Sequence, residues 1–199
     1  MSASEQKGRK PRADVQRNRA ALLRAAQHHF LRHGVGTSLE AVAKDAGVGP
    51  GTLYRHFPTR EALLAAVLQT RSEELVARQE EIAQLGDAGE ALEQWLRALE
   101  EYFSAFSGLP EPLMAAARAQ DPDNPLTLPC DTVITATEEY VRAAHRAGNV
   151  RASVKGYDLF LAALSVAWLK GAGAADEESL DRVRALIATG YRRERDTQA

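Results

Sequence analysis

A run of hydrogen-bonding side chains lies between residues 38 and 60 of the sequence. The run supplies hydroxyls, an imidazole and two guanidinium groups, on Ser38, Thr52, Tyr54, His56, Arg55 and Arg60. Side chains of these types donate hydrogen bonds to phosphate oxygens, and Arg also bonds the edges of bases. The set therefore suits contact with a nucleic acid, with phosphate contacts from the hydroxyls and the imidazole and a phosphate clamp from Arg60.

Three residues with almost no hydrogen-bonding side chain come directly before Thr52. They are Gly49, Pro50 and Gly51. Glycine lets a backbone approach a partner closely, because it has no side chain in the way. Reading of a base sequence would then depend on Tyr54, Arg55 and an apolar contact from Pro50.

The same stretch has the spacing of two short helices that share one tight turn. Ala43 is small enough for a close helix crossing, Gly47 suits the turn, and Val48 and Leu53 are apolar. A helix-turn-helix unit needs these residue types at these places, and its second helix enters the major groove of DNA. We therefore expect residues 49–56 to start a recognition helix.

The rest of the chain also predicts helices. Apolar residues recur at spacings of three and four in almost every segment, and no alternating β-branched run persists, so we expect an all-α fold. Thr37 and Glu40 predict a capping box at the second helix, and Asp87 and Glu90 predict another at the fifth. Thr59 can cap the fourth helix. Residues 121–129 hold three prolines and predict a loop. The expected helices are 15–33, 37–46, 50–56, 60–85, 87–106, 113–119, 131–147, 153–170 and 177–193.

Charge is distributed unevenly along the chain. Residues 1–60 carry eleven Lys or Arg and four Asp or Glu, whereas residues 61–199 carry fourteen and twenty-three. A nucleic-acid contact would therefore be confined to the N-terminal part. Residues 1–14 are expected to be a flexible basic arm, in which Arg9, Lys10 and Arg12 either enter a neighbouring minor groove or remain solvated.

The string GVGPGTLYRHFPTREALL resembles the signature of the tetracycline-repressor (TetR) family of bacterial transcription regulators. Thr52, Leu53, Tyr54, His56 and Phe57 stand where that family favours these residues, and the resemblance covers about residues 15–68. It differs at two positions: glycine replaces the common hydroxyl residue at position 49, and arginine replaces the usual lysine at position 60. The resemblance implies a helix-turn-helix domain over residues 15–60.

The resemblance also implies how the rest of the protein works. Residues 61–199 would form a larger helical domain that binds a small effector and dimerises, so that a homodimer reads a palindromic operator and the effector releases it. The expected dimer interface is Phe160, Leu164, Ala167, Trp168, Val183, Leu186, Ile187 and Tyr191. The site for an apolar or aromatic effector would be lined by some of Trp95, Tyr102, Phe103, Phe106, Met114 and Tyr140.

Other classes of chemistry have little support in the sequence. Cys130 is the single cysteine, so no intramolecular disulfide forms and a reducing cytoplasm is the expected location. His29 and His33 have a spacing that suits a metal, yet no acidic or cysteine residue is near them in sequence. We expect no metal, no cofactor and, because no run of about 18 apolar residues occurs, no membrane contact.

Two alternatives to an effector-controlled repressor remain open. One is a helical enzyme that has kept a vestigial DNA-binding domain, although no nucleophile elbow, P-loop or dinucleotide fingerprint occurs. We therefore expect that the protein is not an enzyme. The other is a DNA-binding dimer without ligand control, which a filled cavity in the C-terminal domain would favour.

Overall fold

The computed structural model describes residues 9–193, with side chains from residue 13 onward. Within that range the chain is helical and has no strand, apart from one isolated bridge between Val150 and Arg192. None of these helices is long and apolar enough to cross a membrane. The all-α prediction is confirmed. The helices are α1 (Arg9–His33), α2 (Leu39–Asp45), α3 (Pro50–His56), α4 (Arg60–Ile82), α5 (Ala88–Ser104), α6 (Pro110–Ala119), α7 (Thr127–Arg146), α8 (Gly156–Gly171) and α9 (Glu177–Tyr191).

Side chains cap the N-termini of helices α4 and α5. Thr59 caps α4, because its hydroxyl accepts the backbone N–H of Ala62 at 3.1 Å. Asp87 caps α5, because its carboxylate accepts the backbone N–H groups two and three residues further on. Both caps agree with the sequence prediction.

The cap of α2 differs from its prediction by one residue. Ser38, not Thr37, has the extended backbone of an N-cap, and its hydroxyl accepts the backbone N–H of Ala41 at 3.2 Å. The predicted end of α1 is confirmed, since Gly34 follows it with a positive φ of 74°.

Two helices begin four or more residues earlier than the sequence predicted. Helix α1 starts at Arg9 and not near residue 15, so the backbone of Arg9, Lys10 and Arg12 is helical and is not a flexible arm; residues 1–8 lie outside the described part. Helix α7 starts at Thr127 and takes in the end of the predicted loop. A proline stands in the first turn of each helix, where its missing N–H is tolerated. The other predicted ends differ by three residues or fewer.

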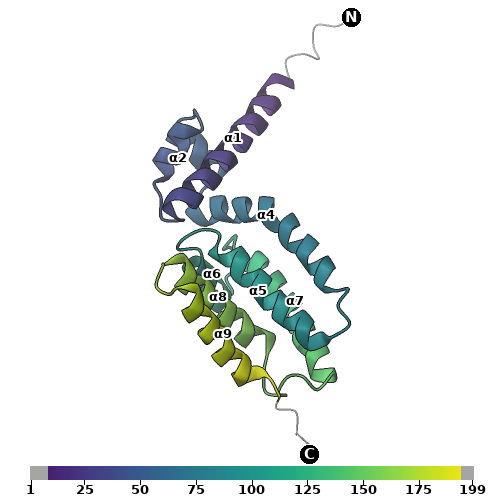
Figure 1. Cartoon of the computed structure of the whole chain (residues 1–199). Helices are drawn as coiled ribbons and strands as arrows, with labels where there is room; N and C mark the ends of the chain where they lie inside the picture. The colour runs from purple at the N-terminus through teal and green to yellow at the C-terminus, as the bar shows by residue number, and fades with distance from the viewer. Residues whose placement is uncertain (1–8, 194–199) are drawn as a thin grey trace, which may run out of the picture.

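The helices form two groups that α4 joins (Figure 1). Helices α1 to α3 make up a small N-terminal unit, and helices α5 to α9 make up a larger C-terminal unit. Figure 1 shows α4 crossing between the two units and then following one side of the larger one. Within the C-terminal unit, α5, α7 and α8 pack most closely together, and α9 packs against α8.

One buried core runs through both units. The ring of Phe30 in α1 packs edge-on against the ring of Phe106, with centroids 5.8 Å apart. The backbone N–H of Val35 donates to the carbonyl of Ser107 at 2.9 Å, so the turn after α1 is bonded directly to the turn after α5. The N-terminal unit is therefore attached at two places, through α4 and through this joint.

Candidate functional site

Helices α2 and α3 meet at a tight turn, as the spacing predicted. Ala43 and Leu53 have no exposed surface, and they fix the crossing of the two helices. Gly47 has a φ of 70°, and the N–H of Val48 donates to the carbonyl of Ala43 at 3.0 Å. The guanidinium of Arg19 in α1 lies 5.3 Å from the centre of the Phe57 ring, just after α3. The turn and α1 thus hold α3 in place.

Most of the predicted DNA-contact residues lie on the surface of this unit. Tyr54 is 42% exposed, which is unusual for a large aromatic side chain. The exposed members of the set are Ser38, Gly49, Pro50, Gly51, Tyr54 and Arg55, and the half-buried members are Thr52, His56 and Arg60. An exposed tyrosine beside an exposed arginine on α3 can reach a partner without any change in the core.

A carboxylate connects two of these residues. Glu40, in the first turn of α2, accepts a hydrogen bond from the Ser38 hydroxyl at 2.8 Å and one from the Tyr54 hydroxyl at 3.3 Å. These bonds lower the pKa of the Glu40 carboxyl, with the Ser38 bond as the largest cause. The sequence analysis missed this residue, because a glutamate three places after Thr37 was interpreted only as a helix cap.

Arg60 makes internal hydrogen bonds that the sequence analysis did not predict. Its Nη1 donates to the carbonyl of Val35 at 2.6 Å and to the carbonyl of Thr37 at 2.7 Å. The guanidinium therefore ties the start of α4 to the turn between α1 and α2. The expected phosphate clamp overlooked this use, because the two carbonyls lie 25 and 23 residues earlier in the chain.

One member of the histidine pair on α1, His29, is also part of the scaffold. The Nε2 of His29 lies 2.7 Å from a carboxylate oxygen of Asp45, and its Nδ1 lies 3.3 Å from the Thr37 hydroxyl. These contacts join α1 to the end of α2. Among the residues with described side chains, no three His, Cys, Asp or Glu are grouped so that they could hold a metal ion.

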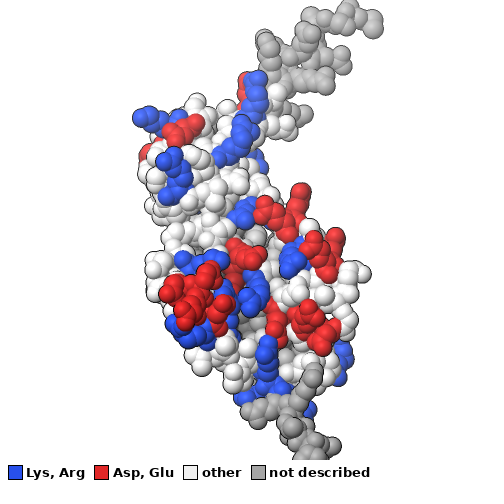
Figure 2. Space-filling model, in the orientation of Figure 1, with Lys and Arg blue, Asp and Glu red and all other residues white. Residues whose placement is uncertain are grey.

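The surface charge follows the division into two units. Figure 2 shows lysine and arginine side chains over the N-terminal unit with few acidic ones among them. Over the C-terminal unit the acidic side chains gather in several patches, with basic ones between them. A polyanion such as DNA is attracted to the first surface more than to the second.

The aromatic residues predicted for an effector site are mostly core residues. Trp95, Phe103 and Phe106 are buried, and Trp95 donates its indole N–H to the Thr137 hydroxyl at 3.0 Å and stacks on Tyr140. Tyr102 and Phe103 of the predicted set border a cavity. That cavity is lined by Leu68, Tyr102, Phe103, Leu113, Pro129, Cys130, Val133 and Phe160.

This cavity is where five helices converge, and it is small. Its lining comes from α4, α5, α6, α7 and α8, and its volume is ≈ 30 Å³. That is room for about one water molecule. The hydroxyl of Tyr102 at its edge donates to the carbonyl of Leu68 in α4 at 3.2 Å. Burial raises the pKa of Tyr102 to about 12, so this hydroxyl remains a donor at neutral pH.

The thiol in this cavity is not a reactive one. Cys130 is buried, and its Sγ lies 3.6 Å from the carbonyl of Leu113. Burial raises the pKa of the Cys130 thiol to about 12. Because the thiolate is the nucleophile, this thiol serves as an apolar wall at neutral pH.

Comparison with known families matches both units. The family described as "Bacterial regulatory proteins, tetR family" matches residues 22–67. The family described as "Transcriptional regulator SbtR-like, C-terminal domain" matches residues 87–193, which is more than half of the chain. The chain belongs to the TetR family. It is therefore a DNA-binding transcriptional regulator, and the proteins of this family are regulators and not enzymes.

Solved and curated relatives agree with this family. A TetR transcriptional regulator from Streptomyces coelicolor is 30% identical over 89% of this chain and 99% of its own, with a TM-score of 0.55. A TetR regulator from Mycobacterium vanbaalenii is 31% identical over 92% and 99%, with a TM-score of 0.50. The HTH-type transcriptional regulator UidR of Escherichia coli K12 is 36% identical over 66 residues. That match spans 33% of this chain and only 34% of UidR, about a third of the curated relative.

In this TetR-family regulator, part of the predicted dimer interface is interior. Phe160, Leu164 and Ala167 have no exposed surface, because α5 and α7 cover their side of α8. Tyr191 is buried as well. In the single chain these four side chains therefore offer little or no surface for a second copy to contact. The other predicted residues keep accessible surface: Trp168 and Leu186 are exposed, at 42% and 73%, and Val183 and Ile187 are half-buried.

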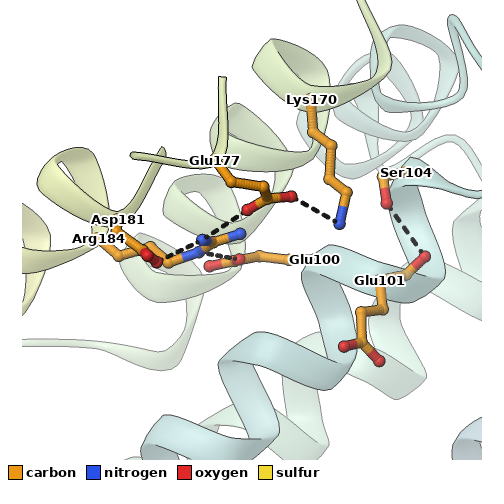
Figure 3. A network of polar contacts seen from close by, with 7 residues as sticks. All are labelled: Glu100, Glu101, Ser104, Lys170, Glu177, Asp181 and Arg184. Carbon is orange, nitrogen blue, oxygen red and sulfur yellow. Dashed lines mark hydrogen bonds and ion pairs between the residues drawn. The ribbon is translucent and has the colours of Figure 1, made fainter. Parts of the chain in front are cut away.

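A charged network fixes helix α9 of the regulator to α5 (Figure 3). The Nε of Arg184 donates to a carboxylate oxygen of Glu100 at 2.7 Å, and its Nη1 donates to Asp181 at 2.8 Å. Lys170 of α8 is 3.5 Å from Glu177, which also contacts Arg184. Burial raises the pKa of the Glu100 carboxyl, and Arg184 offsets part of that rise. Nothing in the sequence signals this pair, because its members are 84 residues apart.

Proposed function

We propose that this TetR-family regulator is a homodimer that represses transcription by binding a palindromic operator, and that a small apolar or aromatic effector releases it. Residues 15–60 would be the DNA-binding domain, and residues 61–199 would bind the effector and dimerise. The protein would act in the cytoplasm on double-stranded DNA. The observation that carries the proposal is the exposed pair Tyr54 and Arg55 on the second helix of a helix-turn-helix.

Reading of the operator would be divided among residues of α2 and α3. Tyr54 and Arg55 are the exposed hydrogen-bonding side chains of α3, so they would contact base edges in the major groove. Gly49, Pro50 and Gly51 would let the backbone approach closely. Phosphate contacts, which set the register and not the sequence, would come from Ser38, Thr52 and His56.

The dimer would form through the outer surfaces of α8 and α9. Trp168 on α8 and Leu186 on α9 are large apolar side chains that water contacts in the single chain. A second copy that covered them would remove apolar surface from water, which is the main favourable contribution to the free energy of most protein associations. Twofold symmetry would then place two α3 helices roughly 34–36 Å apart, one turn of the DNA helix, which requires a palindromic site.

The effector would enter between the helices that surround Tyr102. A cavity of ≈ 30 Å³ cannot hold a drug-sized molecule, so binding would push these helices apart. Helix α4 would respond, because Tyr102 and Tyr140 donate hydroxyl bonds to the carbonyls of Leu68 and Gln79 on α4. A nearly complete release from DNA would require the effector to bind the released state roughly 10⁴-fold more tightly.

The same small volume favours a second candidate function, a DNA-binding dimer without ligand control. In that case the C-terminal unit would only pair two subunits. Linkage separates the two candidates, because an effector that weakens operator binding must itself be bound more weakly by the operator complex. Operator binding that no compound of a broad apolar and aromatic panel alters would support the second candidate.

The experiment that tests the proposal is selection of bound sequences from randomised duplex DNA at two salt concentrations. Recovery of a palindrome, with affinity that falls steeply as salt rises, is the expected result. The Arg55→Ala variant, selected in parallel, should lose preference at one position of each half-site. Salt-sensitive binding without a recovered sequence would leave a DNA-binding protein that reads no operator, and a single unpaired half-site would contradict the dimer.

A further inference from the structure

Glu40 occupies an unusual place for an acidic side chain. It is exposed at the start of α2, and its two carboxylate oxygens accept hydrogen bonds from the hydroxyls of Ser38 and Tyr54. The contact with Tyr54 spans 14 residues and joins α2 to α3. Over the N-terminal unit, few acidic side chains lie among the basic ones (Figure 2). A negative charge therefore lies between two residues that we assign to DNA contact.

Each of these hydroxyls has a single proton to donate. While Glu40 accepts that proton, neither hydroxyl can donate to a phosphate oxygen. A phosphate at this place would have to break the bond to the carboxylate first. Ser38 is restrained further, because its hydroxyl oxygen also accepts the N–H of Ala41 as the cap of α2.

The charge of Glu40 acts in the same direction. The hydrogen bond from Ser38 lowers the pKa of the Glu40 carboxyl, so the group is an anion at neutral pH. An anion beside a phosphate repels it, and at 0.1 M salt this repulsion decays over a distance of about 10 Å. Base edges respond differently, because the amino groups of cytosine and adenine in the major groove are donors that a carboxylate or a hydroxyl oxygen can accept.

We propose that Glu40 is a specificity-determining residue. By holding the proton of Tyr54, its carboxylate disfavours a phosphate contact at this hydroxyl, and so lowers affinity for DNA of arbitrary sequence more than affinity for the operator, where Tyr54 contacts a base edge. Its bond to Ser38 weakens a phosphate contact that the operator and other DNA share, so that bond does not change the ratio of the two affinities. This inference rests on the proposed function, since it assumes that Ser38 and Tyr54 face DNA. The basic residues of this surface attract all DNA, whereas Glu40 would select against DNA of the wrong sequence.

The test compares Glu40→Gln with the full-length wild-type protein. Glutamine keeps the shape and one acceptor oxygen but removes the charge. The control is Glu73→Gln, which makes the same change of net charge at an exposed position of α4. Two probes are used for each protein at low and at moderate salt: the duplex recovered by selection, and a duplex of equal length and composition with a scrambled sequence.

We expect Glu40→Gln to bind the scrambled duplex about fivefold more tightly at low salt, with a smaller gain at moderate salt. Its affinity for the recovered operator should rise less, so the ratio of the two affinities should fall, whereas Glu73→Gln should keep the wild-type ratio. Equal gains on both duplexes, equal losses on both, or no difference from Glu73→Gln would each overturn the inference. Failure of the proposed function would show separately, as a wild-type protein without operator preference.

A double variant checks that the effect passes through the tyrosine hydroxyl. Tyr54→Phe removes the proton that Glu40 holds and leaves the ring in place. If the carboxylate acts as proposed, Glu40→Gln should raise affinity for scrambled DNA less in the Tyr54→Phe background than in the wild type. Equal gains in the two backgrounds would mean that the charge acts on DNA without Tyr54, and this part of the inference would be wrong.

Discussion

The two units of the regulator use polar side chains in opposite ways. In the N-terminal unit the groups assigned to DNA contact, such as Tyr54 and Arg55, are exposed and lie outside the core. In the C-terminal unit the side chains of Glu100 and Arg184 are only 9% and 15% exposed and bind each other. Substitution of the exposed DNA-contact residues in the first unit should therefore change DNA binding and leave the stability of the fold unchanged. Removal of a charge from the buried pair in the second unit should lower the stability of the fold.

Removing Arg184 should give the largest loss of stability. The Arg184→Ala variant leaves the Glu100 carboxylate buried without its main partner, and breaking one partner of a buried pair costs several kcal/mol. We expect the free energy of unfolding to fall by about 3 kcal/mol at neutral pH in a urea titration. The matched control is Arg182→Ala on the same helix, whose pair with Glu178 is exposed and should contribute less than about 1 kcal/mol.

The Arg184→Ala loss should depend on pH. Burial raises the pKa of Glu100 in the folded state above its value in the unfolded chain. Between these two pKa values, folding is coupled to the binding of a proton at this carboxyl. Above the raised pKa the carboxyl is ionised in both states, and it destabilises the fold most. Without Arg184 the pKa rises further. The gap between variant and wild type should therefore narrow as the pH falls toward the usual range for a glutamate. A gap of equal size at pH 8 and pH 5 would contradict the buried-anion explanation.

Arg60 also tests this comparison. It is a charged residue near the DNA-contact surface, but its hydrogen bonds are to backbone carbonyls of the protein itself. Arg60→Ala should lower the free energy of unfolding by about 2 kcal/mol without any DNA, since two carbonyls lose a charged donor. Arg55→Ala, at an exposed position of α3, should leave stability unchanged and weaken DNA binding. If Arg60→Ala melts like the wild type but lowers the salt slope by about one unit, Arg60 is a phosphate contact as the sequence suggested.

The sequence predicted those features that depend on residues close together in the chain. The caps at Thr59 and Asp87 and the turn at Gly47 each involve neighbours within a few residues, so their residue types suffice. The start of α7 was missed because the three prolines of residues 121–129 were interpreted as a loop, although Pro129 stands in a first turn that tolerates it. The start of α1 was missed because the basic residues 1–14 were interpreted as a flexible arm. The correct cap of α2 was missed by one residue, since Thr37 and Ser38 have equivalent hydroxyls.

The contacts that sequence reasoning missed join residues far apart in the chain. His29 meets Asp45 across 16 residues, and Glu100 meets Arg184 across 84. Their types say only that they are polar or charged, and such residues are more often solvated than paired. The same limit applies to the effector site, because which aromatic side chains border the cavity depends on how five helices converge and not on residue type.

The joint between the units offers a sharper comparison of two glycines. Gly34 and Gly47 both have positive φ, at 74° and 70°, so alanine is strained at either place by about 1–2 kcal/mol. A Cβ at Gly34 would also lie 2.6 Å from the carbonyl oxygen of Ser107, whereas one at Gly47 would meet open space. Gly34→Ala should therefore cost about 1 kcal/mol more than Gly47→Ala in urea unfolding, the value of the Val35 to Ser107 bond. Equal losses would mean that the joint adds no stability.

The smallest expected effect concerns the link between the cavity and α4. Tyr102→Phe removes the hydroxyl that donates to Leu68 and should lower the free energy of unfolding by about 1 kcal/mol, the net value of one hydrogen bond. Tyr157→Phe, on α8, serves as the matched control and should change stability by less. Because the pKa of Tyr102 is raised to about 12, the loss should be the same from pH 6 to pH 9. A loss that changed across that range would mean that another titrating group affects this contact. The cavity would then not be separated from the charged surface, as the comparison of the two units requires.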